Sequence, residues 1–216
     1  MNISIPRESR PSEYRVGLSP SGVKRLTRRG HTSYVEHNAG RFAGFSDHDY
    51  ELAGATIVYS THEAFARADL ILKVSRPQDY EMELIRPGAI LGGFLHLTAA
   101  SQSKIDYLLD NQITTVSYEL IQEADGSRPV MKTMTQIGGK LIPQIAAHLL
   151  QNNNGGKGIL ISGIAGIPPA EIVVIGAGML GISTIEALSG IGANITALDI
   201  STNALQNALE IAPRIT

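Results

Sequence analysis

A glycine-rich turn near residue 176 constrains the fold of this chain more than any other segment. The sequence Gly176-Ala-Gly178-Met-Leu-Gly181 follows an apolar run, Ile172–Ile175, and precedes a segment with the composition of a helix. In a strand–turn–helix of this kind the first glycine permits the tight turn and the second lets the backbone approach a pyrophosphate. The third glycine lets helix and strand pack closely. The spacing therefore predicts the phosphate-binding turn of a dinucleotide-binding domain, with the helix N-terminus facing the phosphates.

The acidic residue that such a domain requires is also in place. A second apolar run, Ile195–Leu198, ends at Asp199, which lies 23 residues after Gly176. A carboxylate there accepts hydrogen bonds from ribose hydroxyls and repels a 2′-phosphate, and no arginine follows within Ile200–Asn203. The pattern favours NAD over NADP, and a glycine-rich turn without a cofactor stays the alternative. The expected cofactor-binding residues in this segment are Gly176, Gly178, Met179, Leu180, Gly181 and Asp199.

Short apolar runs alternate with helical segments through the rest of the chain. This alternation indicates an α/β fold with a parallel sheet covered on both faces, and a continuous run such as Leu70–Leu72 is typical of a strand buried on both faces. We expect strands at Ile3–Pro6, Thr32–Glu36, Thr56–Ser60, Asp69–Val74, Ala89–Leu95 and Thr114–Leu120. We expect helices from Ser19 to Gly30 and at Asp47–Ala53, Thr61–Ala68, Asp79–Ile85, Ser101–Asn111, Thr135–Gln151 and Thr202–Ile211.

Two domains follow from this organisation. Residues 1–134 are expected to form a flavodoxin-like parallel-sheet domain that binds the substrate. Residues 135–216 are expected to form a linker helix, kinked or started by Pro143, and then the start of a Rossmann domain. A full dinucleotide-binding fold has two βαβαβ halves, so we expect this second domain to be incomplete. An unpaired sheet edge predicts a homo-oligomer or a second chain that completes the sheet.

Composition excludes several classes of protein. The 216 residues include 20 acidic and 18 basic side chains, and the near-balanced charge argues against a nucleic-acid-binding protein. No cysteine is present, which excludes disulfide scaffolds, thiol catalysis and thiolate zinc sites, and no metal site is expected. No signal peptide or membrane-spanning run is recognisable, and we expect a soluble, cytoplasmic protein that does not contact a membrane directly.

Three charged or titratable side chains lie where a substrate could meet them. Lys73 and His96 follow apolar runs that are expected to be strands, and Arg15 precedes the first helix. Because the carboxyl ends of parallel strands face the ligand crevice, these groups could converge on a small carboxylate, with histidine moving a proton. Each residue also has a structural alternative: the lysine could reach to water, the histidine could be a hydrogen-bonded structural residue, and the arginine could cap a strand.

The order of the motifs resembles that of the alanine dehydrogenase and nicotinamide nucleotide transhydrogenase α-subunit family, over essentially all 216 residues. The similar segments are Ile5–Glu8, Glu13–Val23, Arg29–Gly30, Gly44–Asp47, Ala53–Ala55, Ile71–Val74, Arg86–Gly88, Phe94–Leu97, Met134–Gly139, Gly163–Pro169 and the glycine turn.

The resemblance implies roles for individual residues. In dehydrogenases of the family, the positions that match Arg15 and Lys73 hold the carboxylate and carbonyl of pyruvate, and the position of His96 is a catalytic acid or base. Thr135 stands where a hydroxyl often lies near the nicotinamide. His96 points to the alanine dehydrogenase branch, which oxidises L-alanine with NAD to pyruvate and ammonium. Two alternatives remain open: the NAD(H)-binding part of a proton-translocating transhydrogenase α subunit, and a non-catalytic truncated remnant or binding module.

Overall fold

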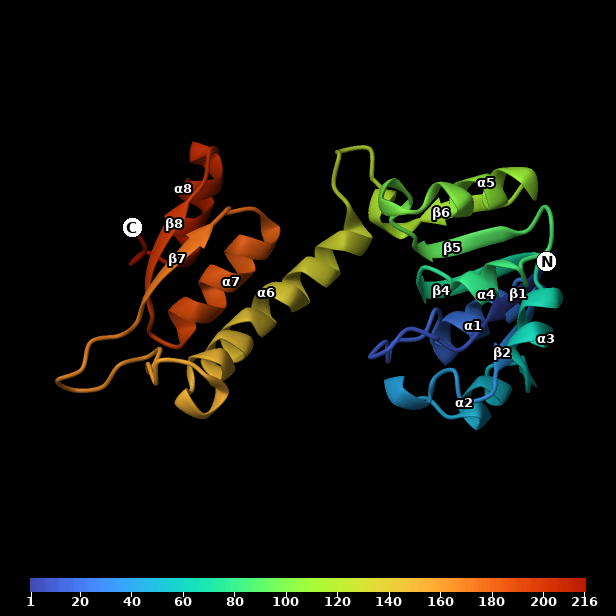
Figure 1. Cartoon of the computed structure of the whole chain (residues 1–216), viewed down its shortest axis with the longest axis horizontal. Coiled ribbons are helices and arrows are strands. Elements are labelled where there is room, and N and C mark those ends of the chain that lie inside the picture. Colours follow the sequence, from blue (N-terminus) through green and yellow to red (C-terminus); the bar gives the residue numbers. More distant parts are fainter. The chain divides into compact units, whose positions relative to one another are not determined.

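The computed structural model describes all 216 residues, and the chain folds into two compact units. Unit 1 comprises Met1–Ile121 and unit 2 comprises Gln122–Thr216. Each unit has its own sheet and its own hydrophobic core, and Figure 1 shows the elements of both. The division falls earlier in the chain than the boundary at 134/135 that the sequence suggests.

Unit 1 is built on six parallel strands in the order β3-β2-β1-β4-β5-β6. The strands are β1 (Asn2–Ile5), β2 (Thr32–Glu36), β3 (Ala55–Val58), β4 (Leu70–Ser75), β5 (Ile90–Phe94) and β6 (Thr114–Ser117). In register, Ile3 of β1 lies opposite Ser33 of β2 on one side and Leu70 of β4 on the other. The order reverses between β1 and β4, and in open α/β sheets ligands bind beyond the carboxyl ends of strands at such a reversal.

The parallel α/β fold predicted from the sequence is confirmed. The strand order differs in one respect from the flavodoxin-like arrangement, whose five strands run 2-1-3-4-5. Here the chain adds β3 outside β2 before it crosses back to β4, so the sheet has the six-stranded order 3-2-1-4-5-6. The physical reason is that Ala55–Val58 pairs with Ser33–Glu36 along its whole length.

Two apolar clusters, one on each face of the sheet, hold unit 1 together. The first joins Ile3, Ile5 and Val35 of the sheet to Val23 of α1 (Pro20–Thr27) and Tyr50 of α2 (Asp47–Leu52). The second joins Ile71 and Leu91 to Phe65, Met82 and Leu108. These last three lie on α3 (Thr61–Ala66), α4 (Asp79–Met82) and α5 (Gln102–Asp110), respectively. Ser19 caps α1 as predicted, because its hydroxyl accepts a hydrogen bond from Gly22 N.

Unit 2 contains one βαβ unit and a long helix. The helix α6 spans Pro129–Leu150 and is followed by β7 (Glu171–Ile175), α7 (Met179–Gly190), β8 (Asn194–Leu198) and α8 (Thr202–Ile211). β7 and β8 are parallel. Pro143 lies inside α6, which begins at Pro129 rather than at the predicted Thr135, so Pro143 does not mark its start. No helix of the structure combines the length and the apolar character that crossing a membrane requires.

Helices α6 and α7 are in close contact at a pair of glycines. A Cβ atom added at Gly139 would lie 2.6 Å from Ser183 Cβ and 2.7 Å from the carbonyl oxygen of Leu180. A Cβ atom at the neighbouring Gly138 would meet Leu180 Cδ1 at 3.7 Å, an ordinary contact. The absence of a side chain at Gly139 therefore sets how closely the two helices approach.

We predict opposite effects for alanine at these two positions. Gly139→Ala is expected to lower the free energy of unfolding of unit 2 by about 1–3 kcal/mol because the added methyl group overpacks the helix contact. Gly138→Ala, the matched control, should raise it by about 0.5–1 kcal/mol through helix propensity. The measurement is urea denaturation followed by circular dichroism. All seven tyrosines lie in unit 1, so tyrosine fluorescence should not change. Equal effects at both positions would contradict the packing account.

Candidate functional site

The loop after β1 carries an arginine that is held in a defined orientation. Arg15 donates from Nε to Glu13 Oε1 at 2.8 Å and from Nη2 to Glu13 Oε2 at 2.6 Å, a bidentate ion pair. Ser75 at the end of β4 donates its hydroxyl to the same Glu13 at 2.8 Å. The hydrogen bonds from Arg15 lower the pKa of Glu13 to about 2, so this carboxylate stays ionised. Arg15 nevertheless keeps 52% of its side chain exposed and available to a ligand.

His96 lies directly after β5 in a strained backbone conformation. Its φ of 47° and ψ of 49° are left-handed, a region that non-glycine residues rarely occupy. The backbone N–H donates to Glu119 Oε1 at 2.7 Å, and the ring atom Nδ1 lies 3.9 Å from the same oxygen. The other oxygen, Glu119 Oε2, is buried without a hydrogen-bond partner. The imidazole itself is 56% exposed, so it is free to meet a substrate.

Phe94 links Arg15 to His96. The guanidinium carbon of Arg15 lies 5.9 Å from the centre of the Phe94 ring, and the His96 ring stacks on Phe94 with centroids 6.5 Å apart. Tyr118 packs edge-on against the Phe94 ring, with the two ring centroids 5.6 Å apart. The structure thus brings two of the three predicted substrate residues together, at the carboxyl edge of the sheet where β1, β4, β5 and β6 end.

Lys73 occupies a different environment from the predicted one. Its side chain has no exposed surface, and Nζ lies 3.0 Å from Glu81 Oε1 and 3.4 Å from Glu8 Oε2. Glu81 is also fully buried, and its second oxygen accepts from Gln78 N at the start of α4. A charge inside an apolar fold needs such partners, and two carboxylates enclose this ammonium group. In this structure Lys73 is therefore a buried counter-ion of two carboxylates, and its role toward a substrate stays a prediction.

Glu8 connects the buried Lys73 to the backbone at the end of β4. Its carboxylate accepts from Val74 N at 2.6 Å and from Ser75 N at 3.3 Å, which fastens the loop after β1 to the end of β4. Burial raises the pKa of Glu8, although Lys73 and these backbone groups oppose the rise.

Several of these partners were not singled out from the sequence. Glu8 and Glu13 lie inside the motif segments, where they could not be told from solvated charges. Glu81 lies on a short helix, and no sequence pattern distinguishes it. Glu119 follows a strand, as His96 does, and this position is the one sequence feature that could have identified Glu119.

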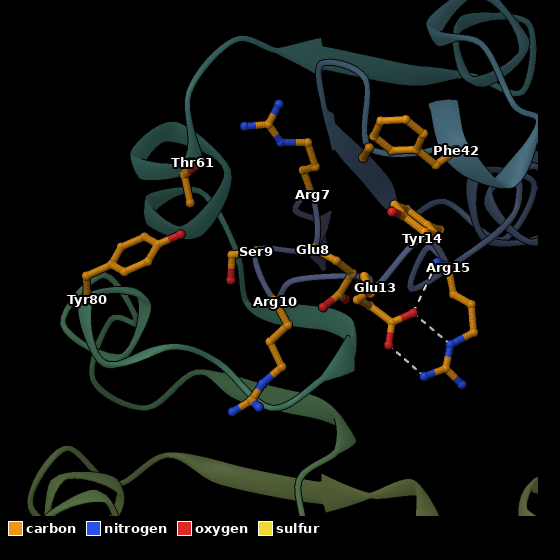
Figure 2. Close-up of a pocket in the computed structure, with 12 residues that line it drawn as sticks. Arg7, Glu8, Ser9, Arg10, Glu13, Tyr14, Arg15, Phe42, Thr61 and Tyr80 are labelled. Carbon is orange, nitrogen blue, oxygen red and sulfur yellow. Dashed lines mark hydrogen bonds and ion pairs between the residues drawn. The ribbon is translucent and has the colours of Figure 1, made fainter. Parts of the chain in front are cut away.

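A cavity of about 360 Å³ opens beside the loop after β1. Figure 2 shows it with Glu13 and Arg15 at one end and Tyr80 and Thr61 at the other. Lys73 and His96 do not line it.

The glycine turn of unit 2 shows a separate reason for each of its three glycines. Gly176 has a φ of +95°, which favours glycine. A Cβ atom at Gly181 would lie 1.8 Å from the carbonyl oxygen of Gly176, so helix and turn touch there. Gly178 has an ordinary φ of −67° and nothing within 4 Å of an added Cβ. The protein itself does not need a glycine at 178, and the space it leaves fits a ligand that approaches the backbone.

Asp199 organises this turn from the end of β8. It accepts hydrogen bonds from Ser201 N at 2.8 Å and from Ala177 N at 2.6 Å, and these lower its pKa. A cavity of about 450 Å³, lined by Gly176, Leu198, Asp199 and Ile200 among others, lies beside it. The site combines apolar walls with one carboxylate, a composition suited to a nucleoside.

The remaining predicted cofactor residues lie on two helices. Met179 and Leu180 form the first turn of α7, directly after Gly178, and both side chains are partly exposed. Thr135 lies on α6, where its hydroxyl donates to the carbonyl oxygens of Met131 and Lys132. No hydrogen bond or cavity joins Thr135 to the glycine turn.

Comparison with known proteins gives matches along nearly the whole chain. The family model "Alanine dehydrogenase/PNT, N-terminal domain" matches residues 4–138, and its C-terminal counterpart matches residues 142–215. An alanine dehydrogenase of Mycobacterium tuberculosis is 41% identical over 206 residues, which are 95% of this chain and 55% of that protein. One from Methanococcus maripaludis is 38% identical over 205 residues, again 95% and 55%. The chain spans about half the length of the curated relatives it matches.

Solved structures agree with this similarity. An L-alanine dehydrogenase superposes with a TM-score of 0.92 at 35% identity, covering 100% of this chain and 59% of the other. A transhydrogenase from Sinorhizobium meliloti superposes with a TM-score of 0.80 at 26% identity, covering 100% and 64%.

We predict that the two ion-paired lysines of unit 1, Lys73 and Lys104, differ sharply in their contribution to stability. Lys73→Met leaves Glu8 and Glu81 buried without their cation and should lower the free energy of unfolding by about 3–5 kcal/mol. Lys104→Met removes the pair that Lys104 makes with the exposed Asp79 at 2.8 Å and should cost less than about 1 kcal/mol. Urea denaturation followed by tyrosine fluorescence measures both. Similar losses in the two variants would show that Lys73 is not the buried anchor described.

Proposed function

The chain belongs to the alanine dehydrogenase/PNT family, and from this membership we propose that it supplies the substrate half and the start of the cofactor half of an L-alanine dehydrogenase. The reaction converts L-alanine, NAD and water to pyruvate, ammonium and NADH, and runs in both directions. We assign the substrate domain to residues 1–134 and the linker helix with part of the Rossmann domain to residues 135–216. The observation that carries the proposal is the pairing of exposed Arg15 and exposed His96 across Phe94.

Arg15 would bind the substrate carboxylate. A guanidinium forms strong paired hydrogen bonds with a carboxylate, and Glu13 keeps the Arg15 side chain from rotating out of position. The positive charge also stabilises an oxyanion that develops nearby.

His96 would move protons. Oxidation at the substrate Cα gives an imine, water adds to it, and the resulting carbinolamine collapses to pyruvate and ammonium. The exposed imidazole takes a proton from the attacking water and returns one to the leaving nitrogen, steps that suit a histidine near neutral pH. The carboxylate of Glu119 beside Nδ1 and beneath the backbone N–H holds the ring at this edge.

Lys73 takes a supporting place in this scheme. The sequence resemblance assigns it to the carbonyl of pyruvate, but its ammonium group is enclosed by Glu8 and Glu81. We therefore propose that Lys73 acts through Glu8, by fixing the loop from which Arg15 extends.

NAD fits the turn of unit 2. The space beside Gly178 admits a pyrophosphate, the first turn of α7 with Met179 and Leu180 presents N–H groups to it, and Asp199 would accept from the ribose. An acid at 199 disfavours the 2′-phosphate of NADP. When bound, NAD supplies the hydride acceptor of the reaction. Thr135 is assigned to the nicotinamide side only through the resemblance.

The sheet of unit 2 needs a further partner. β7 buries Ile172 and Val174 against the core but leaves Val173 and Ile175 exposed, at 58% and 84%. Parallel sheets are normally covered on both faces. We propose that a further segment or a second protein chain completes this sheet, or that copies of the protein associate there.

A second candidate function is the NAD(H)-binding part of a transhydrogenase α subunit, which the Sinorhizobium meliloti structure supports. The higher TM-score and identity of the L-alanine dehydrogenase structure favour the first candidate. A non-catalytic binding module is the third reading.

We predict that His96→Ala lowers the turnover of alanine-dependent NADH formation by about 10²-fold or more, because the proton-transfer group is lost. The assay uses this chain, alone and joined to the C-terminal part of the Mycobacterium tuberculosis relative. His31→Ala, at the start of β2 and outside the site, is the control and should leave turnover unchanged. Full activity in His96→Ala would rule out the assigned role. NADH binding without any alanine-dependent activity would favour the NAD(H)-binding part of a transhydrogenase.

We also predict that this chain binds NAD and that Gly178→Ala weakens binding at least about tenfold, because the methyl group fills the space for the pyrophosphate. Gly190→Ala, where an added Cβ likewise meets nothing within 4 Å, is the matched control and should bind normally. Calorimetry measures the affinity, and circular dichroism checks that both variants are folded. No saturable binding by the unaltered chain would favour the non-catalytic reading.

A further inference from the structure

The turn that follows β6 contacts the candidate site of unit 1 twice. This 3-10 helix, η3 (Tyr118–Leu120), comes directly after the strand that pairs with β5. Its second residue, Glu119, accepts the backbone N–H of His96 at 2.7 Å. Its first residue, Tyr118, packs edge-on against Phe94, with the ring centroids 5.6 Å apart and the ring planes at 84°. The proposed reaction gives Tyr118 no role, so its place beside Phe94 needs an explanation of its own.

Phe94 contacts both of the side chains on which the proposed reaction rests. The His96 ring is nearly parallel to the Phe94 ring, at 20°, with the centroids 6.5 Å apart. The guanidinium carbon of Arg15 lies 5.9 Å from the centre of the same ring. Phe94 is only partly buried at the end of β5, so neighbouring side chains decide where its ring lies. Tyr118 is therefore placed to fix the Phe94 ring and, through it, the spacing of the arginine and the imidazole.

A glycine on β5 leaves the space that Tyr118 occupies. A Cβ atom at Gly92 would lie 3.1 Å from Tyr118 Oη and 3.3 Å from Tyr118 Cε1. Gly92 is not among the residues with a positive φ, so its backbone conformation does not require glycine. Side chains alternate along a strand, which puts positions 92 and 94 on one face of β5, where Tyr118 packs against both. The missing side chain at Gly92 is therefore explained by the contact with Tyr118.

The chemistry of the Tyr118 phenol fits a packing role. Burial raises the pKa of Tyr118, and the nearby charge of Glu8 adds to the rise. A phenol that keeps its proton more firmly than usual is poorly suited to take a proton from a substrate near neutral pH. Contact with Phe94, and not proton transfer, is the role left to this side chain.

We propose that Tyr118 is a positioning residue of the candidate site, which fixes the Phe94 ring and thereby the spacing of His96 and Arg15. The expected effect on turnover rests on the proposed dehydrogenase function. The contacts themselves can be tested on this chain alone, without any assay of activity.

The first test follows the ring protons of His96 by NMR, with a His96→Gln variant to identify them among the six histidines. The ring current of Phe94 acts on these protons through the near-parallel stack, so a movement of Phe94 changes their shifts. Tyr118→Leu should move the signals, and Tyr118→Phe should retain them because the edge-on ring remains. Tyr107→Leu is the matched control, because Tyr107 packs against the cluster of Leu91 on the other face of the sheet. It should leave the signals unchanged.

A double-mutant cycle tests the part played by the glycine. Gly92→Ala should also move the His96 signals, because the added methyl group displaces the Tyr118 ring. In a Tyr118→Leu background the same alanine should add no further shift, since the ring atoms that it would meet are absent. Shifts that add in the double variant would contradict the coupling of Gly92 to Tyr118.

The second test is turnover, measured with each variant joined to the C-terminal part of the Mycobacterium tuberculosis relative. Tyr118→Leu should lower kcat for alanine at least about tenfold, because a displaced proton-transfer group is poorly aligned with the reacting atoms. KM for alanine should stay nearly unchanged, since Glu13 still holds Arg15 by two hydrogen bonds. The imidazole of His96 has no such hydrogen bond, and its Nδ1 approaches Glu119 Oε1 only to 3.9 Å. Tyr118→Phe should restore kcat.

Four outcomes would overturn the proposal. They are unchanged His96 signals in Tyr118→Leu, an equal displacement in Tyr107→Leu, a loss of kcat in Tyr118→Phe as large as in Tyr118→Leu, and displaced signals with an unchanged kcat. Full turnover in His96→Ala would instead remove the proposed function, and the NMR result would still decide the contact. Thermal melting of each variant checks that a changed signal does not come from unfolding.

Discussion

The edge of unit 1 that carries Arg15 and His96 depends on one buried ammonium group. Lys73 sits between Glu81 and Glu8, and Glu8 in turn accepts the backbone N–H groups of Val74 and Ser75. These contacts connect the loop after β1, the end of β4 and the start of α4, three segments that meet only in the folded chain. Glu13, held by Ser75 Oγ, extends the connection to Arg15. The position of the Arg15 side chain therefore depends on the buried ion pairs of Lys73.

Sequence reasoning reached the fold class because its signals are local. Alternating strands and helices, the Ser19 cap and the glycine turn each depend on neighbours along the chain, and the structure contains all of them. Strand order is not local, because whether Ala55–Val58 pairs outside β2 depends on hydrogen bonds across the sheet. The sequence predicted this strand and the parallel fold but not the position of the strand in the order. The ion pairs of Lys73 could not be predicted for the same reason, since its partner Glu8 lies 65 residues away and nothing in the strand reveals it. The roles of His96 and Arg15 stay predictions, and the structure shows that both side chains are about half exposed.

The candidate sites of the two units rest on different amounts of buried structure. In unit 1 the site residues rest on a six-stranded sheet with an apolar cluster on each face. In unit 2 the glycine turn rests on two strands and one such cluster, and a face of β7 stays exposed. Local stability follows the amount of buried contact, so the glycine turn should open more readily than the edge that carries Arg15 and His96.

The left-handed backbone at His96 has a consequence for stability. A residue with a Cβ atom in this conformation costs about 1 kcal/mol relative to glycine, so exchange of His96 for glycine would relieve the strain. Ser12, Asn38 and Gln112 also have a positive φ. The backbone at His96 is therefore one of four places where a side chain occupies a conformation that glycine adopts at lower cost.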